Sequence, residues 1–136
     1  MTARTKARKR ALDILFECEL RSLPLGETLT ERVAIGEPPV NEYTITLVEG
    51  VAEHREQIDA LLTKRAEGWT LARMPTVDRN ILRIGAFEVL HNDDVPDQVA
   101  ISEAVGLARE LSTDESPAFV NGMLAALVRD KTQQVG

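Results

Sequence analysis

Hydrophobic residues recur at three- and four-residue intervals along most of the chain, which is the spacing of amphipathic helices. No segment has the regular alternation of a β-strand, and no internal repeat is visible. The pattern predicts helices over residues 4–20, 28–35, 41–54, 55–66, 77–90, 97–111 and 118–131. The segment after His54 either continues the preceding helix or bends away near Arg55. The expected fold is therefore an all-α single compact bundle of six or seven helices.

The segment Val77–Leu90 is apolar on nearly all sides when it is placed on a helix. A helix of that kind is normally enclosed by other helices, so we expect it at the centre of the core. Gly85 disfavours a helix by about 1 kcal/mol relative to Ala, which indicates that a neighbour packs close to the backbone there. Glu88 lies among apolar neighbours. The favoured interpretation is a structural carboxylate paired with an Arg or with backbone N–H groups, and the alternative is a carboxyl whose pKa is raised for proton transfer.

Residues with strong positional preferences mark several predicted boundaries. Asn41 is a suitable N-cap for the third helix, and Ser116 before Pro117 has the order of a cap and a first turn. Asn121-Gly122 is a common hairpin dipeptide, but the apolar residues around it keep helical spacing, so a helix is expected there. Trp69 lies in the connection before the central helix, where we expect it to fill the core together with Leu71 and Met74.

The net charge of −6 is distributed unevenly. The first ten residues hold five cations and no acid: Arg4, Lys6, Arg8, Lys9 and Arg10. Without these five, 11 basic and 22 acidic residues remain, and the rest of the chain has a net charge of about −11. Helix N-termini favour anions, so cations placed there do not serve local helix stability. A localised contact with an anionic ligand is the favoured explanation, and a solvated, frayed terminus is the alternative.

Length and composition exclude several classes of protein. We expect one domain, and the absence of an apolar run of about 18 residues argues against a membrane span. The basic start lacks the apolar region of a signal peptide, so a cytoplasmic protein is expected. Cys18 is the only cysteine, which excludes an internal disulfide, and its place on an apolar stripe favours packing over reactivity.

The sequence lacks the patterns that carry catalysis or metal binding. His54 and His91 have no metal-ligand spacing with Asp, Glu or Cys, and there is no Gly-rich phosphate loop or nucleophile elbow. We therefore expect no catalytic residue, no metal and no cofactor. A small helical domain of this kind usually acts by binding.

Several segments in order resemble the NusB family of bacterial transcription antitermination factors. They are K-x-R-K-R-A-L-D-I-L-F near the start, V-D-R-N-I-L-R-I-G-A-F-E-V-L in the middle, V-P-D-Q-V-A-I-S-E-A-V-G-L-A-R-E-L after it, and F-V-N-G-M-L near the end. The resemblance covers nearly the whole chain. It implies an all-helical fold of two small subdomains, here residues 1–66 and 67–136.

The resemblance also implies a function. Proteins of this family are non-catalytic adaptors that bind the single-stranded boxA element of ribosomal RNA leaders together with the ribosomal protein NusE. The bound pair promotes read-through by RNA polymerase. An acidic body would suit a basic ribosomal protein by charge complementarity.

The family's arginine-rich start implies an RNA-binding role for five residues: Arg4, Lys6, Arg8, Lys9 and Arg10. Lys offers a point charge without the guanidinium fork, so phosphate contacts are expected at Lys6 and Lys9 more than base contacts. Phe119, in the F-V-N-G segment, either stacks on an unpaired base or packs in the core. Glu115 and Ser116 are expected to line the same RNA surface.

The resemblance places NusE on the central helix, where Asp78 and Arg79 are expected to be the most exposed polar residues. Two other functions stay open. One is a recognition domain serving an RNA cytosine methyltransferase, although these 136 residues contain no cofactor-binding segment. The other is a helical protein-interaction module whose basic start binds an acidic partner. A homodimer that hides the RNA surface is also possible.

Overall fold

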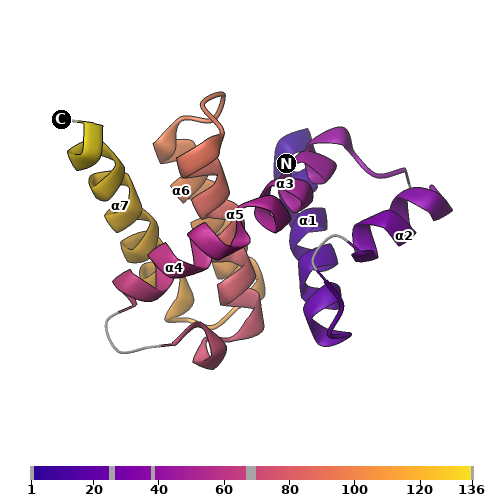
Figure 1. Ribbon diagram of the computed structural model, residues 1–136, viewed down its shortest axis with the longest axis horizontal. Helices are drawn as coiled ribbons and strands as arrows, with labels where there is room; N and C mark the ends of the chain where they lie inside the picture. The colour runs from indigo at the N-terminus through magenta and orange to yellow at the C-terminus, as the bar shows by residue number, and fades with distance from the viewer. Residues whose placement is uncertain (1, 25–26, 38, 67–69, 136) are drawn as a thin grey trace.

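The computed structural model describes residues 2–24, 27–37, 39–66 and 70–135. This part of the chain forms seven α-helices and one short 3₁₀ helix, and it contains no β-strand (Figure 1). The elements are α1 (Ala3–Leu20), α2 (Glu27–Ile35), α3 (Glu42–Glu53), α4 (Arg55–Arg65), η1 (Leu71–Arg73), α5 (Thr76–His91), α6 (Asp97–Leu111) and α7 (Ser116–Val135). The prediction of an all-α bundle is confirmed.

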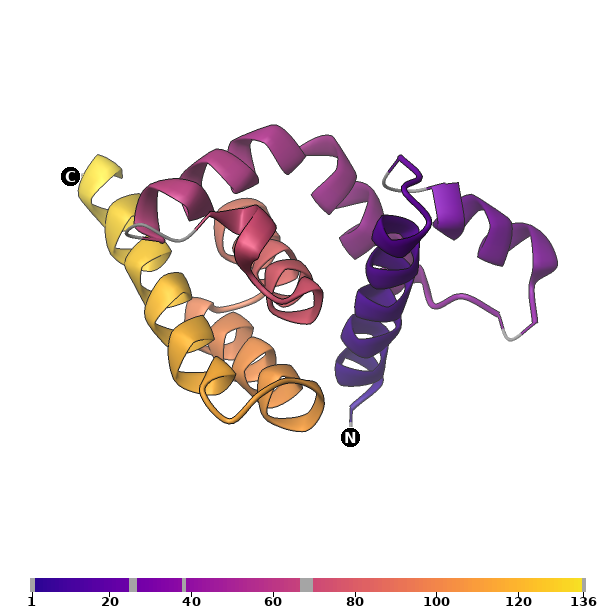
Figure 2. The ribbon, with the colours of Figure 1, turned by 90° about the horizontal axis from the view of Figure 1, so that it is seen from below.

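Helix α5 lies at the centre of the bundle, in contact with α1, α3, α4, α6 and α7 (Figures 1 and 2). Its residues from Asn80 to Val89 are all buried, as the nearly uniform apolar pattern predicted. The close approach predicted at Gly85 is confirmed, because a Cβ atom there would lie 2.6 Å from Leu124 Cδ1 of α7. On another side, the Phe87 ring packs against the backbone of α3 at Gly50.

Several predictions about where the helices begin, bend and continue are confirmed. Asn41 caps α3, because its Oδ1 accepts a hydrogen bond of 2.7 Å from the backbone N–H of Tyr43. The chain bends at His54, between α3 and α4, which decides between the two alternatives left by the sequence. Asn121-Gly122 lies inside α7, so the helical interpretation was correct, and α7 continues beyond the predicted end at residue 131 to Val135.

Helix α2 packs on α1 and lies at the opposite end of the molecule from α7 (Figures 1 and 2). Gly36 follows α2 with a φ of +69°, a conformation that ends helices and that glycine adopts without steric cost. Met74 is buried and Leu71 packs against the core, as predicted. Trp69 lies outside the described residues.

The proposed boundary between residues 66 and 67 also borders on undescribed residues. Helix α5 packs against elements from both halves of the chain, and the division into two subdomains stays a prediction. None of the helices described above is long and apolar enough to cross a membrane.

Candidate functional site

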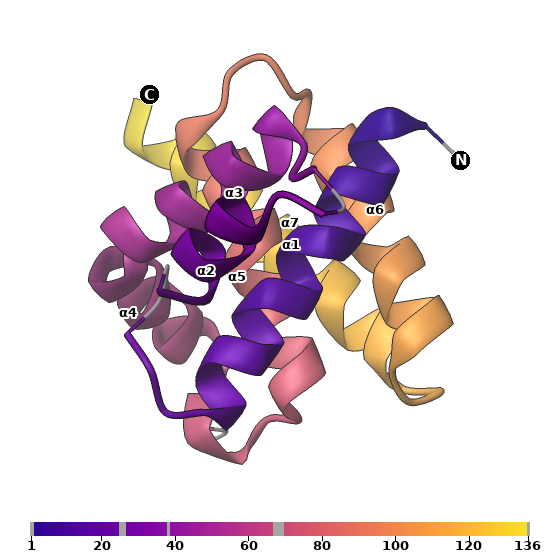
Figure 3. The same cartoon turned by 90° about the vertical axis from the view of Figure 1, so that its right-hand side faces the viewer.

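The basic residues of α1 are presented by a helix that three hydrogen bonds fix at its N-terminal end. Thr2 Oγ1 caps the helix by accepting a 3.0 Å bond from the backbone N–H of Thr5. The Thr5 hydroxyl donates to Glu103 of α6 at 2.9 Å, and the Thr44 hydroxyl of α3 donates to the Ala7 carbonyl at 2.9 Å. These bonds tie the helix start to α3 and α6, so it does not resemble a frayed terminus. Figure 3 shows the course of α1 across this side of the molecule.

One of the five predicted RNA-binding cations points into the protein. Arg8 is 3% exposed, and its Nε donates to both carboxylate oxygens of Glu88 at 3.0 Å. Its Nη1 lies 3.5 Å from an oxygen of Glu103. Burial lowers the pKa of Arg8, but the hydrogen bond and charge of Glu88 raise it by more, so the guanidinium stays charged. Arg8 therefore serves the fold, and the predicted structural pairing of Glu88 with an Arg is confirmed.

The other four cations lie at the surface or only half-buried. Lys9 pairs with Glu110 of α6 at 2.7 Å, and both side chains remain partly exposed. Arg4, Lys6 and Arg10 form no ion pair with any residue that the structure describes. Their charges are therefore available to a ligand. Lys9 can leave Glu110 for a ligand at little cost in free energy, because exposed ion pairs are weak.

Three of these cations line one groove between α1 and the start of α3. Lys6, Lys9 and Arg10 line the groove together with Asn41, Thr44 and one acid, Asp13. Ammonium and guanidinium groups beside the side-chain amide of Asn41 form a set of donors that suits phosphate oxygens. The Thr44 hydroxyl is not among them, because it is buried and donates to the Ala7 carbonyl. The groove is thus chemically fit to bind a polyanion.

The predicted RNA-binding residues at the start of α7 and just before it form a second cluster. Glu115, Ser116 and Phe119 line one pocket with Met74 and with Asp78 of α5. Phe119 is half-buried and packs against the core, and stacking of its ring on a base stays a prediction. This pocket includes Thr113, which follows the C-terminal end of α6, and Glu110 near the same end pairs with Lys9.

The expectation that Asp78 and Arg79 are the most exposed polar residues of α5 is wrong. Asp78 is 4% exposed, and it accepts hydrogen bonds from the hydroxyls of Ser112 and Ser116. Arg79 pairs with Glu19 of α1 and donates to the Leu71 carbonyl at 2.6 Å. A polar residue on a helix is exposed to solvent only when no neighbouring element supplies a hydrogen-bond or ion-pair partner. Here α1 and α7 supply such partners.

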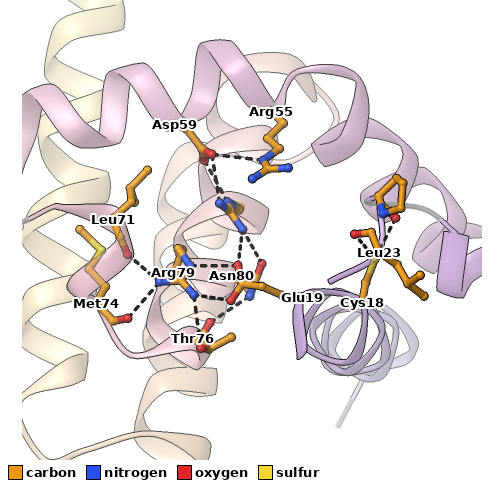
Figure 4. A network of polar contacts seen from close by, with 12 residues as sticks. Cys18, Glu19, Leu23, Arg55, Asp59, Leu71, Met74, Thr76, Arg79 and Asn80 are labelled. Atoms are coloured by element: carbon orange, nitrogen blue, oxygen red, sulfur yellow. Dashed lines mark hydrogen bonds and ion pairs between the residues drawn. The ribbon is translucent and has the colours of Figure 1, made fainter. Parts of the chain in front are cut away.

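Arg79 belongs to a network that joins four elements (Figure 4). Arg83, which is 3% exposed, lies 3.1 Å from a Glu19 oxygen and 2.9 Å from an Asp59 oxygen of α4. It also donates to the side chain of Asn80 at 3.1 Å. Together with the bonds from Arg79 to the connection before α5, these contacts hold α1, α4, α5 and η1 in register.

Two further features were missed by the sequence analysis. Tyr43 lies beside both Arg4 and Arg8, although nothing in its sequence spacing marks it. The rings of His54 and His91, far apart in sequence, stack with their centroids 3.7 Å apart. Such pairs depend on how helices cross, which periodicity within one helix does not report.

The described residues contain no group of three or more His, Cys, Asp or Glu side chains that could hold a metal ion. Cys18 is fully buried, as predicted, and its thiol donates to the carbonyls of Leu23 and Pro24 at 3.3 and 2.9 Å.

Comparison with known proteins gives consistent results. The model of the NusB family matches residues 5–129. The transcription antitermination protein NusB of Nocardioides sp. is 56% identical over 131 residues, which are 96% of this chain and 97% of that protein.

Solved structures agree with the sequence comparison. T. maritima NusB is similar with a TM-score of 0.83 and 32% identity, over 94% of this chain and 92% of that one. A second structure holds the antitermination factors NusB and NusE in complex with double-stranded RNA. Its matching chain has a TM-score of 0.80 and 28% identity, over 93% of this chain and 96% of its own length.

Proposed function

The chain belongs to the NusB family, and on this premise we propose that it is a transcription antitermination factor that binds RNA together with NusE. It acts as an adaptor, because the exposed cations of α1 offer charges and hydrogen-bond donors to a ligand. RNA polymerase then reads through terminators in the complex that the adaptor and NusE join.

One observation carries this proposal. The groove between α1 and α3 gathers Lys6, Lys9 and Arg10 on a chain whose remaining residues are strongly acidic. An acidic body repels nucleic acid in general, so a compact cationic groove restricts the contact to one place. RNA phosphates occupy this groove, with Arg4 beside it.

The second cluster adds contacts that depend on the base. A half-buried Phe119 ring beside the exposed Glu115 offers a surface for stacking and a carboxylate for hydrogen bonding. Ser116 supports this pocket from inside, because it is 2% exposed and its hydroxyl donates to Asp78. The preferred RNA is the single-stranded boxA element. A related complex holds double-stranded RNA, so the test has to include both forms.

NusE binds next to α5, through residues near Asp78 and Arg79. The structure buries Asp78, so its contribution would be to hold the Ser112 and Ser116 hydroxyls in place rather than to contact the partner. Arg79, whose side chain is 12% exposed, would likewise act mainly by fixing the connection before α5.

Fluorescence anisotropy of labelled RNA tests the proposal. The probes are a boxA strand, a scrambled strand and a boxA duplex, each measured with and without NusE across a salt series. We expect the boxA strand to bind most tightly and NusE to widen the difference. If four cations each neutralise one phosphate, log affinity falls against log salt with a slope of about −3 for a single strand. Equal, weak binding of all three probes would contradict the proposal and would favour a protein-interaction module.

The groove is tested by a matched pair of variants. The double variant Lys6→Ala/Arg10→Ala removes two cations of the groove, and Lys64→Ala/Arg129→Ala removes two exposed cations of α4 and α7. The first should weaken RNA binding about tenfold or more and make the salt slope shallower by about 1.4, whereas the second should change neither. Equal effects of the two variants would mean that only total charge matters.

A further inference from the structure

Tyr43, in the first turn of α3, lies against two of the basic residues of α1. The guanidinium carbon of Arg4 is 4.3 Å from the centroid of the Tyr43 ring, and that of Arg8 is 5.6 Å away. Both distances are within the range of a cation–π interaction. The two arginines differ in what else they contact, because Arg8 is buried against Glu88 and Arg4 is exposed.

The tyrosine ring is itself held from the other side. Its hydroxyl donates to the buried carboxylate of Glu88 in α5, and it accepts a 3.1 Å hydrogen bond from Asn92 Nδ2. Burial, followed by the hydrogen bond and charge of Glu88, raises the pKa of Tyr43 to about 12. The phenol therefore stays protonated, and it bonds the ring to the central helix.

We propose that Tyr43 is a positioning residue for RNA binding, which holds the guanidinium of Arg4 in a fixed place at the start of α1. The proposal rests on the RNA-binding function proposed above. The order of contacts is Glu88 in the core, then the Tyr43 ring, then Arg4 at the surface. Arg8 contacts the same ring from the buried side and pairs with Glu88.

A guanidinium placed over a ring keeps its N–H groups at its edge, so Arg4 remains able to donate to a phosphate or a base. A long side chain normally loses much rotational freedom when it binds a ligand. The ring reduces that loss, because Arg4 is already restricted before the RNA arrives. Lys6 has no aromatic neighbour among the described residues, and it provides an internal comparison.

A double-mutant cycle tests this role by RNA anisotropy. The single variants are Arg4→Ala and Tyr43→Leu, and the control cycle combines Lys6→Ala with Tyr43→Leu. We expect Arg4→Ala and Tyr43→Leu each to weaken boxA binding about threefold, the size of a surface cation–π contact. The Arg4→Ala/Tyr43→Leu double variant should bind no more weakly than Arg4→Ala alone, whereas the effects of Lys6→Ala and Tyr43→Leu should multiply.

Multiplying effects in both cycles would overturn the proposal, because Tyr43 would then act independently of Arg4. If the unsubstituted protein does not bind RNA at all, the proposed function fails instead, so the two failures are distinguishable. Tyr43→Phe keeps the ring and loses the hydroxyl. It should be less stable to urea yet retain RNA affinity within about twofold and retain the coupling to Arg4.

A spectroscopic readout is independent of folding stability. Tyr43 is the only tyrosine of the chain, so its ring protons give a single set of tyrosine signals in NMR spectra. These signals should shift on addition of RNA in the unsubstituted protein and shift much less in Arg4→Ala. Equal RNA-induced shifts in the two proteins would contradict a link between Arg4 and the ring.

Discussion

Residues of one type, separated by a single turn of α1, serve different purposes in this protein. Arg4 is exposed at the surface, whereas Arg8 is buried and bound to Glu88. The buried pair joins the first helix to the central one, and the surface cations depend on that joint for their position. Charge reversal of the whole basic segment would therefore confuse loss of binding with loss of structure.

Replacing Arg8 should affect stability more than any other change among the five cations. In Arg8→Met the Glu88 carboxylate stays buried without the Arg8 guanidinium. Removing one partner of a buried ion pair typically costs about 3–5 kcal/mol of unfolding free energy. Urea denaturation followed by circular dichroism measures the change. Lys6→Met is the control and should alter the unfolding free energy by less than about 0.5 kcal/mol. Similar values for the two variants would mean that the Arg8–Glu88 pair contributes little.

The stacked imidazoles of His54 and His91 predict a pH dependence of stability. Burial, and then the neighbouring His54, lower the pKa of His91 in the folded protein. The unfolded chain then binds the proton more readily, so stability is complete above about pH 6.5 and is lost as the pH falls through the lower folded-state pKa.

Urea midpoints measured from pH 7.5 to pH 5.5 test this effect against His91→Gln. The variant should lose less stability than the unsubstituted protein over this range, because it lacks the titrating ring. Parallel curves for the two proteins would assign the pH dependence to carboxylates elsewhere.

At the scale of elements, glycines mark where helices approach α5. A Cβ atom at Gly50 of α3 would lie 2.2 Å from an atom of the Phe87 ring, and the buried ring has little room to move. Gly50→Ala should therefore destabilise the protein by about 1–3 kcal/mol, as overpacking usually does. Gly122→Ala in α7 meets nothing within 4 Å and should instead stabilise by about 0.5–1 kcal/mol. Thermal unfolding of both variants checks the opposite signs.

If Lys9 binds RNA as proposed, helix α6 competes with the RNA for this cation of α1. Glu110 holds Lys9 at 2.7 Å, and this ion pair must open before Lys9 can reach a phosphate. Glu110→Gln removes the competitor, and RNA affinity should rise about two- to threefold, in keeping with the small free energy of exposed pairs. Glu56→Gln on α4 changes the net charge equally and is the matched control. The same gain in both variants would point to a general charge effect.

The elements themselves were largely predictable. Apolar spacing located the seven α-helices of the described residues, and Asn41 marked the start of α3. The site was predictable only in part. Five cations near the start indicated anion binding, but which of them face solvent depends on Glu88, Glu103 and Glu110, which lie far along the chain. Asp78 and Arg79 appeared exposed for the same reason, because their partners belong to other helices.

At the scale of the whole molecule, binding and folding are linked through α1. One face of this helix contributes Leu12 and Leu15 to the core, and another lines the cationic groove proposed to bind RNA. Any ligand that binds only the folded state must therefore stabilise it.

Saturating boxA RNA should raise the unfolding free energy by about 2.7 kcal/mol at a free RNA concentration 100-fold above its Kd. Urea titration with and without RNA measures the gain. In Lys6→Ala/Arg10→Ala the gain at the same RNA concentration should be smaller by about 1.4 kcal/mol for each tenfold loss of affinity. An equal gain in that variant would mean that the groove is not the binding site.

The Arg8–Glu88 pair also has a consequence for synthesis, because its partners are 80 residues apart. At 5–20 residues per second, translation of that interval takes roughly 4–16 s. During this time the cationic segment has left the peptidyl-transferase centre, while the helix that fixes it has not yet been made. The nascent chain therefore carries its positive charges before the Arg8–Glu88 pair can form. It emerges beside the rRNA-rich surface of the ribosome.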